Sequence, residues 1–313
     1  MTVDTARARW QDALRDAGSP RTTQPTTVAL GDALGRVLAE PLRVPLAVPG
    51  ELVPGNELLL STGTEIGPFQ VAIAAASGYA TLTVMRAPLV VILPTGDNLR
   101  AVDDAVAAGD RIDAISPLLA AHVVRSGAEP AVRMVCPDDP ALLRELLRIE
   151  AARADVVIVG LGARTTVSDV LAELGEVVVS HVAAEPLQAV QLAVIGDTPV
   201  IGVPDHPVFA AVAAMIFLEP VLLGLRGVRS PRVTRRRISL VATVFAHPEH
   251  DLYVPVALIN GDRAAPLATV GQAFAGFADA NALLRVPAGV DLAAGELADV
   301  ELFAALSSSV NPL

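Results

Sequence analysis

The sequence contains no lysine, and all 23 of its basic residues are arginines. This absence excludes mechanisms that need a Schiff-base lysine, the lysine of a phosphate-binding P-loop or a lysine general base. Cys136 is the only cysteine, which excludes intrachain disulfides and metal sites built from several cysteines. Aromatic residues make up only 3% of the chain, too few for a base-stacking surface.

Acidic residues outnumber basic ones by 34 to 23, which gives a net charge of −11. This balance leaves no basic stripe for a phosphate backbone, so we expect no nucleic-acid partner. The first residues lack the apolar run of a signal peptide, and the longest such run, residues 208–218, is too short to span a bilayer. The 313 residues, 52% of them hydrophobic, therefore predict an acidic, cytoplasmic α/β protein of two or three domains without a membrane partner.

Apolar runs alternate with helical patterns in the middle of the chain. The runs predict buried strands at 89–93, 155–160 and 198–203, and a further strand at 176–180. Helices are predicted at 68–77, at 115–126, from Asp139-Pro140 onward, up to residue 174 and at 207–218. Residues 28–40 also read as a helix, with Leu30, Leu34, Val37 and Leu38 on one face. Alternation of this kind is typical of a largely parallel sheet.

Polar and glycine residues follow three of the predicted strands. Ligands bind beyond the carboxyl ends of strands in such sheets, so these residues outline a candidate cleft. Its members are Thr95, Gly96, Asp97, Gly160, Gly162, Arg164, Pro204, Asp205, His206 and Pro207. Asp205 precedes the helix at 207, and we expect it to cap that helix rather than leave the helix terminus free for a phosphate.

Other polar patterns predict structure rather than chemistry. His247 and His250 flank Pro248, which breaks any helix that would align them on a metal, so we expect a surface loop. Gly160 and Gly162 lack the third glycine of a dinucleotide fingerprint. His122 and His181 are isolated and expected to be structural, and the arginines at 235–237 are expected on a solvated edge or linker.

Several segments are similar, in sequence and in order, to one known family. They are VALGDALGRVLAE (28–40), VPGNELLL (53–60), PLVVILPTGD (88–97), CPDDP (136–140) and residues 265–303. The chain thus resembles the molybdopterin molybdenumtransferases, the family of MoeA and the gephyrin E domain. The resemblance implies a MogA-like parallel or mixed sheet flanked by helices, an elongated N-terminal α+β domain (1–86), an α/β domain (87–229) and a small C-terminal β domain (230–313).

The resemblance also implies a reaction and partners. The family inserts molybdate into adenylylated molybdopterin with a divalent cation, so Mg²⁺, molybdopterin and molybdate are the cofactor and substrates that it suggests. It suggests a homodimer as well, and contact with other proteins of molybdenum-cofactor biosynthesis.

Most site motifs of the family are altered in this sequence. The family's inserted domain is absent near residues 49–51, and the acid of its TGDE motif is Asn98. Its Asp-Ser-Asn stands here as residues 113–115, its lysine-bearing loop as 185–189 and its Pro-Gly-Asn-Pro as 204–207. The resemblance also assigns Glu185 to the cleft, where this glutamate stands in place of the family's cation. At ~6 Å and a dielectric of ~20, one unit-charge pair is worth roughly 3 kcal/mol. We therefore expect the fold to be kept and the anion site to be lost.

Three functions follow from these patterns. The first is a MoeA-like protein with weak or lost activity that acts as a scaffold, regulator or store. The second is an active, divergent transferase with catalytic candidates Asp97, Asp113 and Asp169 and with Mg²⁺ bound through Asp97 and Asp205. The third is a binder of another small, uncharged metabolite, which would suit Leu187 and Val208.

Overall fold

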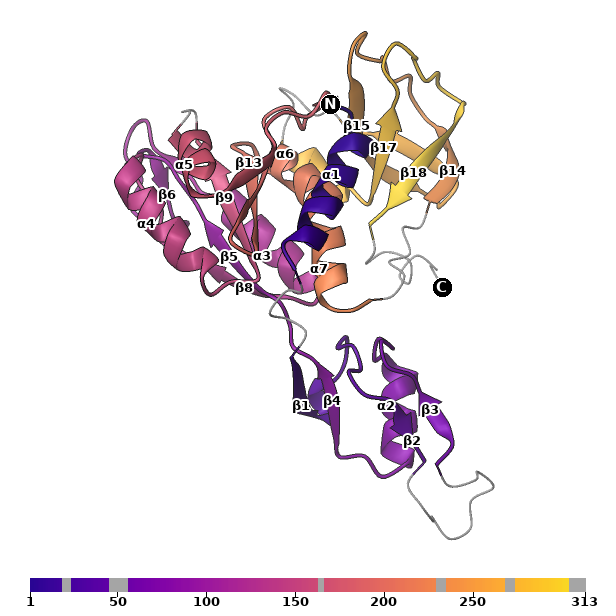
Figure 1. Ribbon diagram of the computed structural model, residues 1–313. Coiled ribbons are helices and arrows are strands. Elements are labelled where there is room, and N and C mark those ends of the chain that lie inside the picture. Colours follow the sequence, from indigo (N-terminus) through magenta and orange to yellow (C-terminus); the bar gives the residue numbers. More distant parts are fainter. Residues whose placement is uncertain (19–23, 45–55, 163–165, 229–234, 268–273, 304–313) are drawn as a thin grey trace.

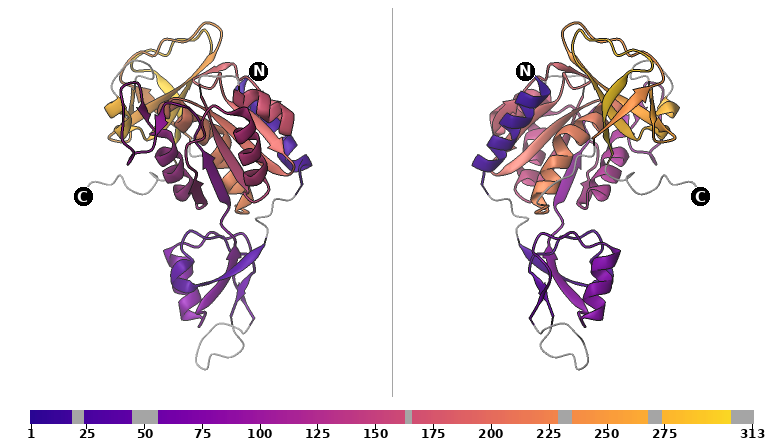
Figure 2. Two further views of the ribbon diagram at one scale, coloured as in Figure 1. Left: turned by 90° about the vertical axis from the view of Figure 1, so that its left-hand side faces the viewer. Right: turned by 90° about the vertical axis from the view of Figure 1, so that its right-hand side faces the viewer.

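A computed structural model describes residues 1–18, 24–44, 56–162, 166–228, 235–267 and 274–303 of the chain. These residues form three parts: a central α/β domain, a C-terminal β domain beside it, and an N-terminal lobe (Figure 1). The lobe lies below the two other parts in both side views, which makes the molecule elongated (Figure 2).

The central domain is built on a six-stranded mixed sheet. Its order is β10-β12-β13-β9-β5-β8, in which β13, β9, β5 and β8 run parallel and β12 is antiparallel to both of its neighbours. The strands are β5 (Leu89–Leu93), β8 (Glu129–Val132), β9 (Val156–Leu161), β10 (Glu176–Val179), β12 (Gln191–Ile195) and β13 (Thr198–Pro204). The predicted mixed sheet is therefore confirmed, and two of its strands, β8 and β12, were not predicted.

Helices cover both faces of this sheet. One face carries α3 (Ile115–Arg125) and α6 (Pro207–Ala213), and the other carries α4 (Pro140–Ala151) and α5 (Thr166–Leu174). The predicted start of α4 is confirmed, since Asp139 accepts hydrogen bonds from the amides of Ala141 and Leu142. Each face thus has its own apolar core, as expected for buried parallel strands.

The first helix, α1 (Val3–Asp16), belongs to the central domain. Its side chains Val3, Ala6 and Trp10 are buried in the same core as α3 and α6. This helix lies within the predicted N-terminal domain 1–86, but it packs beside α6 and α7 rather than in the lobe (Figure 1). Its apolar stripe faces the sheet, where the helix contacts the strands β10 and β12.

Helix α6 continues past its predicted end at residue 218. A π-helical turn (Ala214–Leu218) leads into α7 (Glu219–Leu225), so the chain stays helical through Pro220. A wider turn of this kind accommodates a proline, which has no N–H to donate. Within the described residues, Pro207–Leu225 is one helix long and apolar enough to cross a membrane by length and composition, but most of it is buried in the core of the central domain.

The N-terminal lobe contains two short antiparallel sheets and one helix. β1 (Pro25–Ala29) pairs with β4 (Thr81–Met85), and β2 (Leu42–Arg43) pairs with β3 (Leu58–Leu60). The predicted helix at 68–77 is confirmed as α2 (Pro68–Ala76). The prediction about the inserted domain near residues 49–51 falls outside the described residues.

The helix predicted at 28–40 is wrong. The chain forms the end of β1 and a short 3₁₀ turn (Leu30–Asp32), and isolated bridges then pair Val37 with Glu65 and Leu38 with Val84. Gly35 has a φ of 73° and donates its N–H to the carbonyl of Ile66 at 2.8 Å. The left-handed backbone at Gly35 ends any helix, and pairing with β4 supplies the hydrogen bonds instead.

The C-terminal domain is a closed sheet. β15 pairs with both β16 and β17, and β14 and β18 complete the ring, so no strand of the five is left at an edge. Its strands are β14 (Arg235–Leu240), β15 (Asp251–Ile259), β16 (Arg263–Pro266), β17 (Ala282–Val286) and β18 (Leu297–Leu302). A two-residue strand of the central domain, β11 (Ala184–Glu185), pairs with the start of β15 and so connects the two domains.

A buried arginine connects the lobe to the central domain. Arg226, whose side chain is 8% exposed, donates to the carbonyls of Gly35 and Ser126 and to the carboxylate of Glu65. Gly127 lies directly against the guanidinium, where an added Cβ would come within 2.6 Å of Arg226 Cζ. One side chain therefore satisfies acceptors on both sides of the junction.

We expect Arg226→Gln to lower the free energy of unfolding by about 3 kcal/mol, because it leaves the buried carbonyl of Ser126 and the half-buried carbonyl of Gly35 without their donor. Glu65→Gln is the matched control: the Glu65 side chain is 56% exposed, so its loss is expected to cost less than about 1 kcal/mol. Urea unfolding of both variants measures the difference. Equal losses would contradict the role given to Arg226.

Candidate functional site

The carboxyl ends of β5, β9 and β13 meet at one edge of the central sheet. Four of the predicted cleft residues lie together there: Thr95, Gly160, Gly162 and Asp205. Asp113 and Ser116, at the start of α3, complete the polar part of the lining. The structure therefore brings residues from three separate strand ends to one place, as the parallel topology requires.

The cavity at this edge is very small. Its volume is about 20 Å³, enough for about one water molecule, whereas small-molecule sites usually measure about 300 Å³ or more. Most of its wall is apolar, formed by Ile92, Leu93, Leu99, Ile115, Leu119, Ile158 and Val203. The Thr95 hydroxyl also donates to the carbonyl of Gly160 at 2.7 Å, which joins the ends of β5 and β9.

An ion pair lies at the mouth of the cavity. Arg111, on the short strand β7 (Arg111–Ile112) that pairs with β6 (Leu99–Arg100), donates to the carboxylate of Asp205. Arg111 was not among the predicted site residues, and no sequence pattern relates it to a residue 94 positions away. The prediction that Asp205 caps α6 is wrong: the N-cap is His206, which makes no capping hydrogen bond through its side chain.

Two of the three candidate catalytic carboxylates, Asp97 and Asp113, accept hydrogen bonds from backbone amides. Asp113 is buried and accepts from the amides of Ile115 and Ser116 at 3.1 and 2.9 Å, so it caps α3. Asp97 accepts from the amide of Asp138 at 2.9 Å and, with Gly96, lines a neighbouring cavity. Asp169 is exposed in the first turn of α5.

These residues do not fit a bound Mg²⁺ ion. Among the residues described, no group of three or more histidine, cysteine, aspartate or glutamate side chains is placed to hold a metal. Mg²⁺ takes oxygen ligands in a near-octahedral arrangement, and here Asp113 bonds to amides while Asp205 bonds to Arg111. The carboxylates at this edge are therefore engaged by backbone amides and by Arg111.

Among the described residues, the other predicted cleft residues do not line this cavity. Glu185 pairs with β15 next to the C-terminal domain and does not line the cavity, so the charge argument built on it does not apply there. Leu187 is fully buried in the core and is not available to a ligand. Arg164 falls outside the described residues. Pro204 ends β13, and Pro207 begins α6.

The histidine pair predicted to lie in a loop does so. His247 and His250 stack with ring centroids 4.7 Å apart in the segment between β14 and β15, and the amide of Glu249 donates to His247 Nδ1. This hydrogen bond closes a local turn around Pro248.

Comparison with known proteins agrees with the fold. Residues 91–224 match the family described as a probable molybdopterin-binding domain. A MoeA protein from Pyrococcus horikoshii superposes with a TM-score of 0.84 at 22% identity, covering 96% of this chain and 98% of that one. A molybdenum cofactor biosynthesis protein from Pyrococcus furiosus gives 0.71 at 24% identity, covering 94% and 97%.

Sequence relatives point to the same family. A molybdopterin molybdenumtransferase from Nostoc is 32% identical over 54% of this chain and 41% of its own length. Molybdopterin molybdenumtransferase 1 of Mycobacterium tuberculosis is 29% identical over 82% of this chain and 64% of its own length. The chain thus covers less than two thirds of either relative.

The central domain, with its four parallel strands and the cavity at their carboxyl ends, is similar over residues 91–224 to a probable molybdopterin-binding domain. Together with the lobe and the closed β domain, it has the fold of the MoeA protein from Pyrococcus horikoshii. In sequence, the chain is similar to molybdopterin molybdenumtransferases over part of their length.

A buried histidine lies beyond the cleft, on the last turns of α3. His122 is 8% exposed, and Arg125 donates to its Nδ1 at 2.9 Å. Burial, with a smaller contribution from the charge of Arg125, lowers the pKa of His122 to about 3. The imidazole is therefore neutral in the folded protein at pH values where it is protonated in the unfolded chain.

Stability is expected to fall as the pH drops from about 6.5 toward about 3, because across this range the unfolded chain binds a proton that the folded protein does not. The effect of this one group reaches at most about 1.4 kcal/mol per pH unit. Urea unfolding at several pH values should show a smaller loss for His122→Gln than for the unaltered protein, while the exposed control His181→Gln should follow the unaltered protein. Parallel curves for all three would contradict this linkage.

Proposed function

We propose that this protein acts in molybdenum-cofactor biosynthesis as a cytoplasmic scaffold, regulator or store, and that its molybdenum insertion activity is weak or lost. The family's reaction, insertion of molybdate into adenylylated molybdopterin, needs a site for a phosphate-bearing pterin. The proposal rests on the cavity at the strand ends, because it is the place where such a substrate would bind.

The size of that cavity is the observation that carries the proposal. A volume of about 20 Å³ does not admit a pterin, and the apolar side chains that fill it are core residues of the sheet and α3. The neighbouring cavity that Asp97 and Asp113 line is about 400 Å³, but it lies on the β8 side and does not reach the ends of β9 and β13. Opening it would expose Ile92, Leu119, Ile158 and Val203, each at most 2% exposed. Exposing one such side chain costs about 1.5–3 kcal/mol, so a substrate would have to provide several times that energy before binding productively.

The charges at the mouth of the cavity also disfavour binding of a phosphate. The Asp205 carboxylate stands at the mouth and already pairs with Arg111, the cation that would otherwise attract a phosphate. The two side chains are 24% and 48% exposed, so their attraction is worth at most about 1 kcal/mol and does not by itself close the cavity. Its consequence is that a phosphate arriving at the mouth meets a neutral pair instead of a cation.

An active transferase dependent on Mg²⁺ is the main alternative. It needs the carboxylates at the strand ends to be free for a metal, yet Asp97 and Asp113 accept backbone hydrogen bonds and Asp205 accepts from Arg111. This alternative is therefore the less favoured one, and the following titration separates it from the proposal.

Titration with adenylylated molybdopterin in the presence of Mg²⁺ is expected to give no saturable heat with the unaltered protein.

Asp205→Ala removes the carboxylate and frees Arg111, so we expect it to bind pyrophosphate at least about tenfold more tightly than the unaltered protein. Asp103→Ala, which removes an exposed carboxylate from the preceding segment, is the control and should change nothing. Micromolar or tighter binding of the pterin by the unaltered protein would overturn the proposal in favour of the active transferase.

We also propose that the protein is a homodimer that associates through the N-terminal lobe. Family resemblance suggests the dimer, and three large apolar side chains of the lobe, Leu34, Phe69 and Ile73, are 61%, 81% and 39% exposed. Exposed apolar groups of this size on one part of a molecule favour an interface.

Light scattering is expected to give the mass of a dimer for the unaltered protein and that of a monomer for Phe69→Glu, because the new charge would be buried at the interface. Phe245→Glu, which replaces a phenylalanine 73% exposed on the C-terminal domain, should stay dimeric. A monomer in the unaltered protein would refute the dimer, and a dimer in both variants would place its interface elsewhere.

A further inference from the structure

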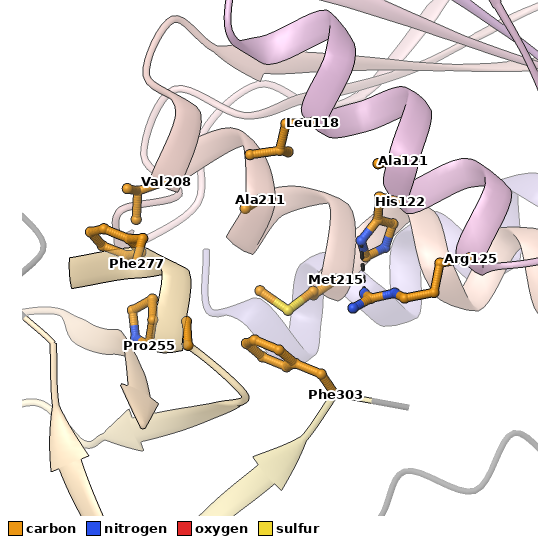
Figure 3. Close-up of a pocket in the computed structure, with 11 residues that line it drawn as sticks. Leu118, Ala121, His122, Arg125, Val208, Ala211, Met215, Pro255, Phe277 and Phe303 are labelled. Atoms are coloured by element: carbon orange, nitrogen blue, oxygen red, sulfur yellow. Dashed lines mark hydrogen bonds between the residues drawn. The ribbon is translucent and has the colours of Figure 1, made fainter. Parts of the chain in front are cut away.

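A second, larger cavity lies between the central and C-terminal domains. Its volume is about 300 Å³, at the lower end of the range for small-molecule sites. Helices α3 and α6 form one wall, and Pro255 of β15, Phe277 of the 3₁₀ turn Phe274–Asp279 and Phe303 form the other (Figure 3). Cavities at domain junctions are common places for ligands.

The wall of this cavity is almost entirely apolar. Side chains from both domains point into the same space, as Figure 3 shows for Leu118, Val208, Met215, Phe277 and Phe303. Val208 had been assigned to the cleft at the strand ends, but the structure places it here. A ligand in this cavity would therefore bury an apolar body and gain the corresponding hydrophobic free energy.

One cation lies at the rim. The guanidinium of Arg125 lies beside His122 near Met215 and Phe303, and its Nη2 donates to His122 Nδ1 at 2.9 Å (Figure 3). An arginine can only donate, so Nδ1 is the acceptor and the imidazole carries its proton on Nε2. A neutral, buried histidine thus holds the guanidinium in place without cancelling its charge.

The charge of Arg125 is not neutralised by a direct ion pair. His122 Nε2 lies 3.7 Å from the carboxylate of Glu219, so the imidazole stands between Glu219 and Arg125. Among the described residues, no carboxylate oxygen lies within 4.0 Å of the Arg125 guanidinium. Burial raises the pKa of Glu219, although Arg125 opposes that rise and Glu301 adds to it.

From this arrangement we propose that the cavity binds a small monocarboxylate with an apolar chain or ring, its carboxylate on Arg125 and its apolar body between α3, α6 and the C-terminal domain. The single cation matches a single negative charge, and the apolar wall offers no hydrogen-bond partners for a pterin or a nucleotide base. The site is separate from the strand-end cavity, so it stands whether or not molybdenum insertion occurs.

Isothermal titration of the full chain with octanoate and with phenylacetate tests the site. Octanol, which has the chain length of octanoate but no charge, is the control ligand. We expect saturable binding of the carboxylates and at least about tenfold weaker binding by Arg125→Gln, because a charge-assisted contact is lost. The control Arg263→Gln removes an exposed arginine of β16 and should leave binding unchanged.

A second variant tests the cavity itself. Ala211→Leu places a larger side chain in the wall and leaves Arg125 in place, so it should weaken octanoate binding by about tenfold or more through lost space. Circular dichroism and the melting temperature of each variant check that it folds. No saturable binding by the unaltered protein, equal binding of octanol and octanoate, or unchanged binding by Arg125→Gln would each overturn the proposal.

Discussion

Polar groups at and beside the carboxyl ends of the parallel strands bond to other groups of the protein, and the rest of the site follows from this constraint. Thr95 donates to Gly160, Asp113 caps α3 and Asp205 accepts from Arg111. A carboxylate that already accepts two amide hydrogen bonds has little to gain from a metal, and a paired arginine has little charge left for a phosphate. The edge of the sheet where ligands usually bind is thus stabilised in a closed form.

The strand-end cavity and the cavity between the central and C-terminal domains are formed by different parts of the molecule. The strand-end cavity is bounded by one domain, whose core packing reaches almost to the last residues of β5, β9 and β13. The larger cavity lies where α3 and α6 meet the closed β domain, and side chains of both domains line it. A MoeA-like fold with its usual cleft closed therefore still offers a place for a small ligand.

Prediction from sequence succeeded where a local pattern determined the structure. The apolar run at 89–93 and the Asp139-Pro140 start of α4 both report on neighbouring residues alone, and both are confirmed. Prediction failed for residues 28–40. Their spacing of apolar residues is helical, but the chain pairs with β4 and has a positive φ at Gly35, and neither is compatible with a helix. Asp205 was assigned to its nearest helix for the same local reason, while its actual partner is 94 residues away.

By itself, the sequence determined the resemblance to one family, the mixed α/β class and which strand ends would carry polar residues, since hydrophobic periodicity and residue order are properties of the chain. Only the tertiary structure decided that the strand-end cavity is closed, that Glu185 and Leu187 lie outside it, and that Arg125 faces an apolar space. The volume of a cavity and the partner of a charge depend on side chains brought together from distant segments. Those distances exist only once the chain is folded.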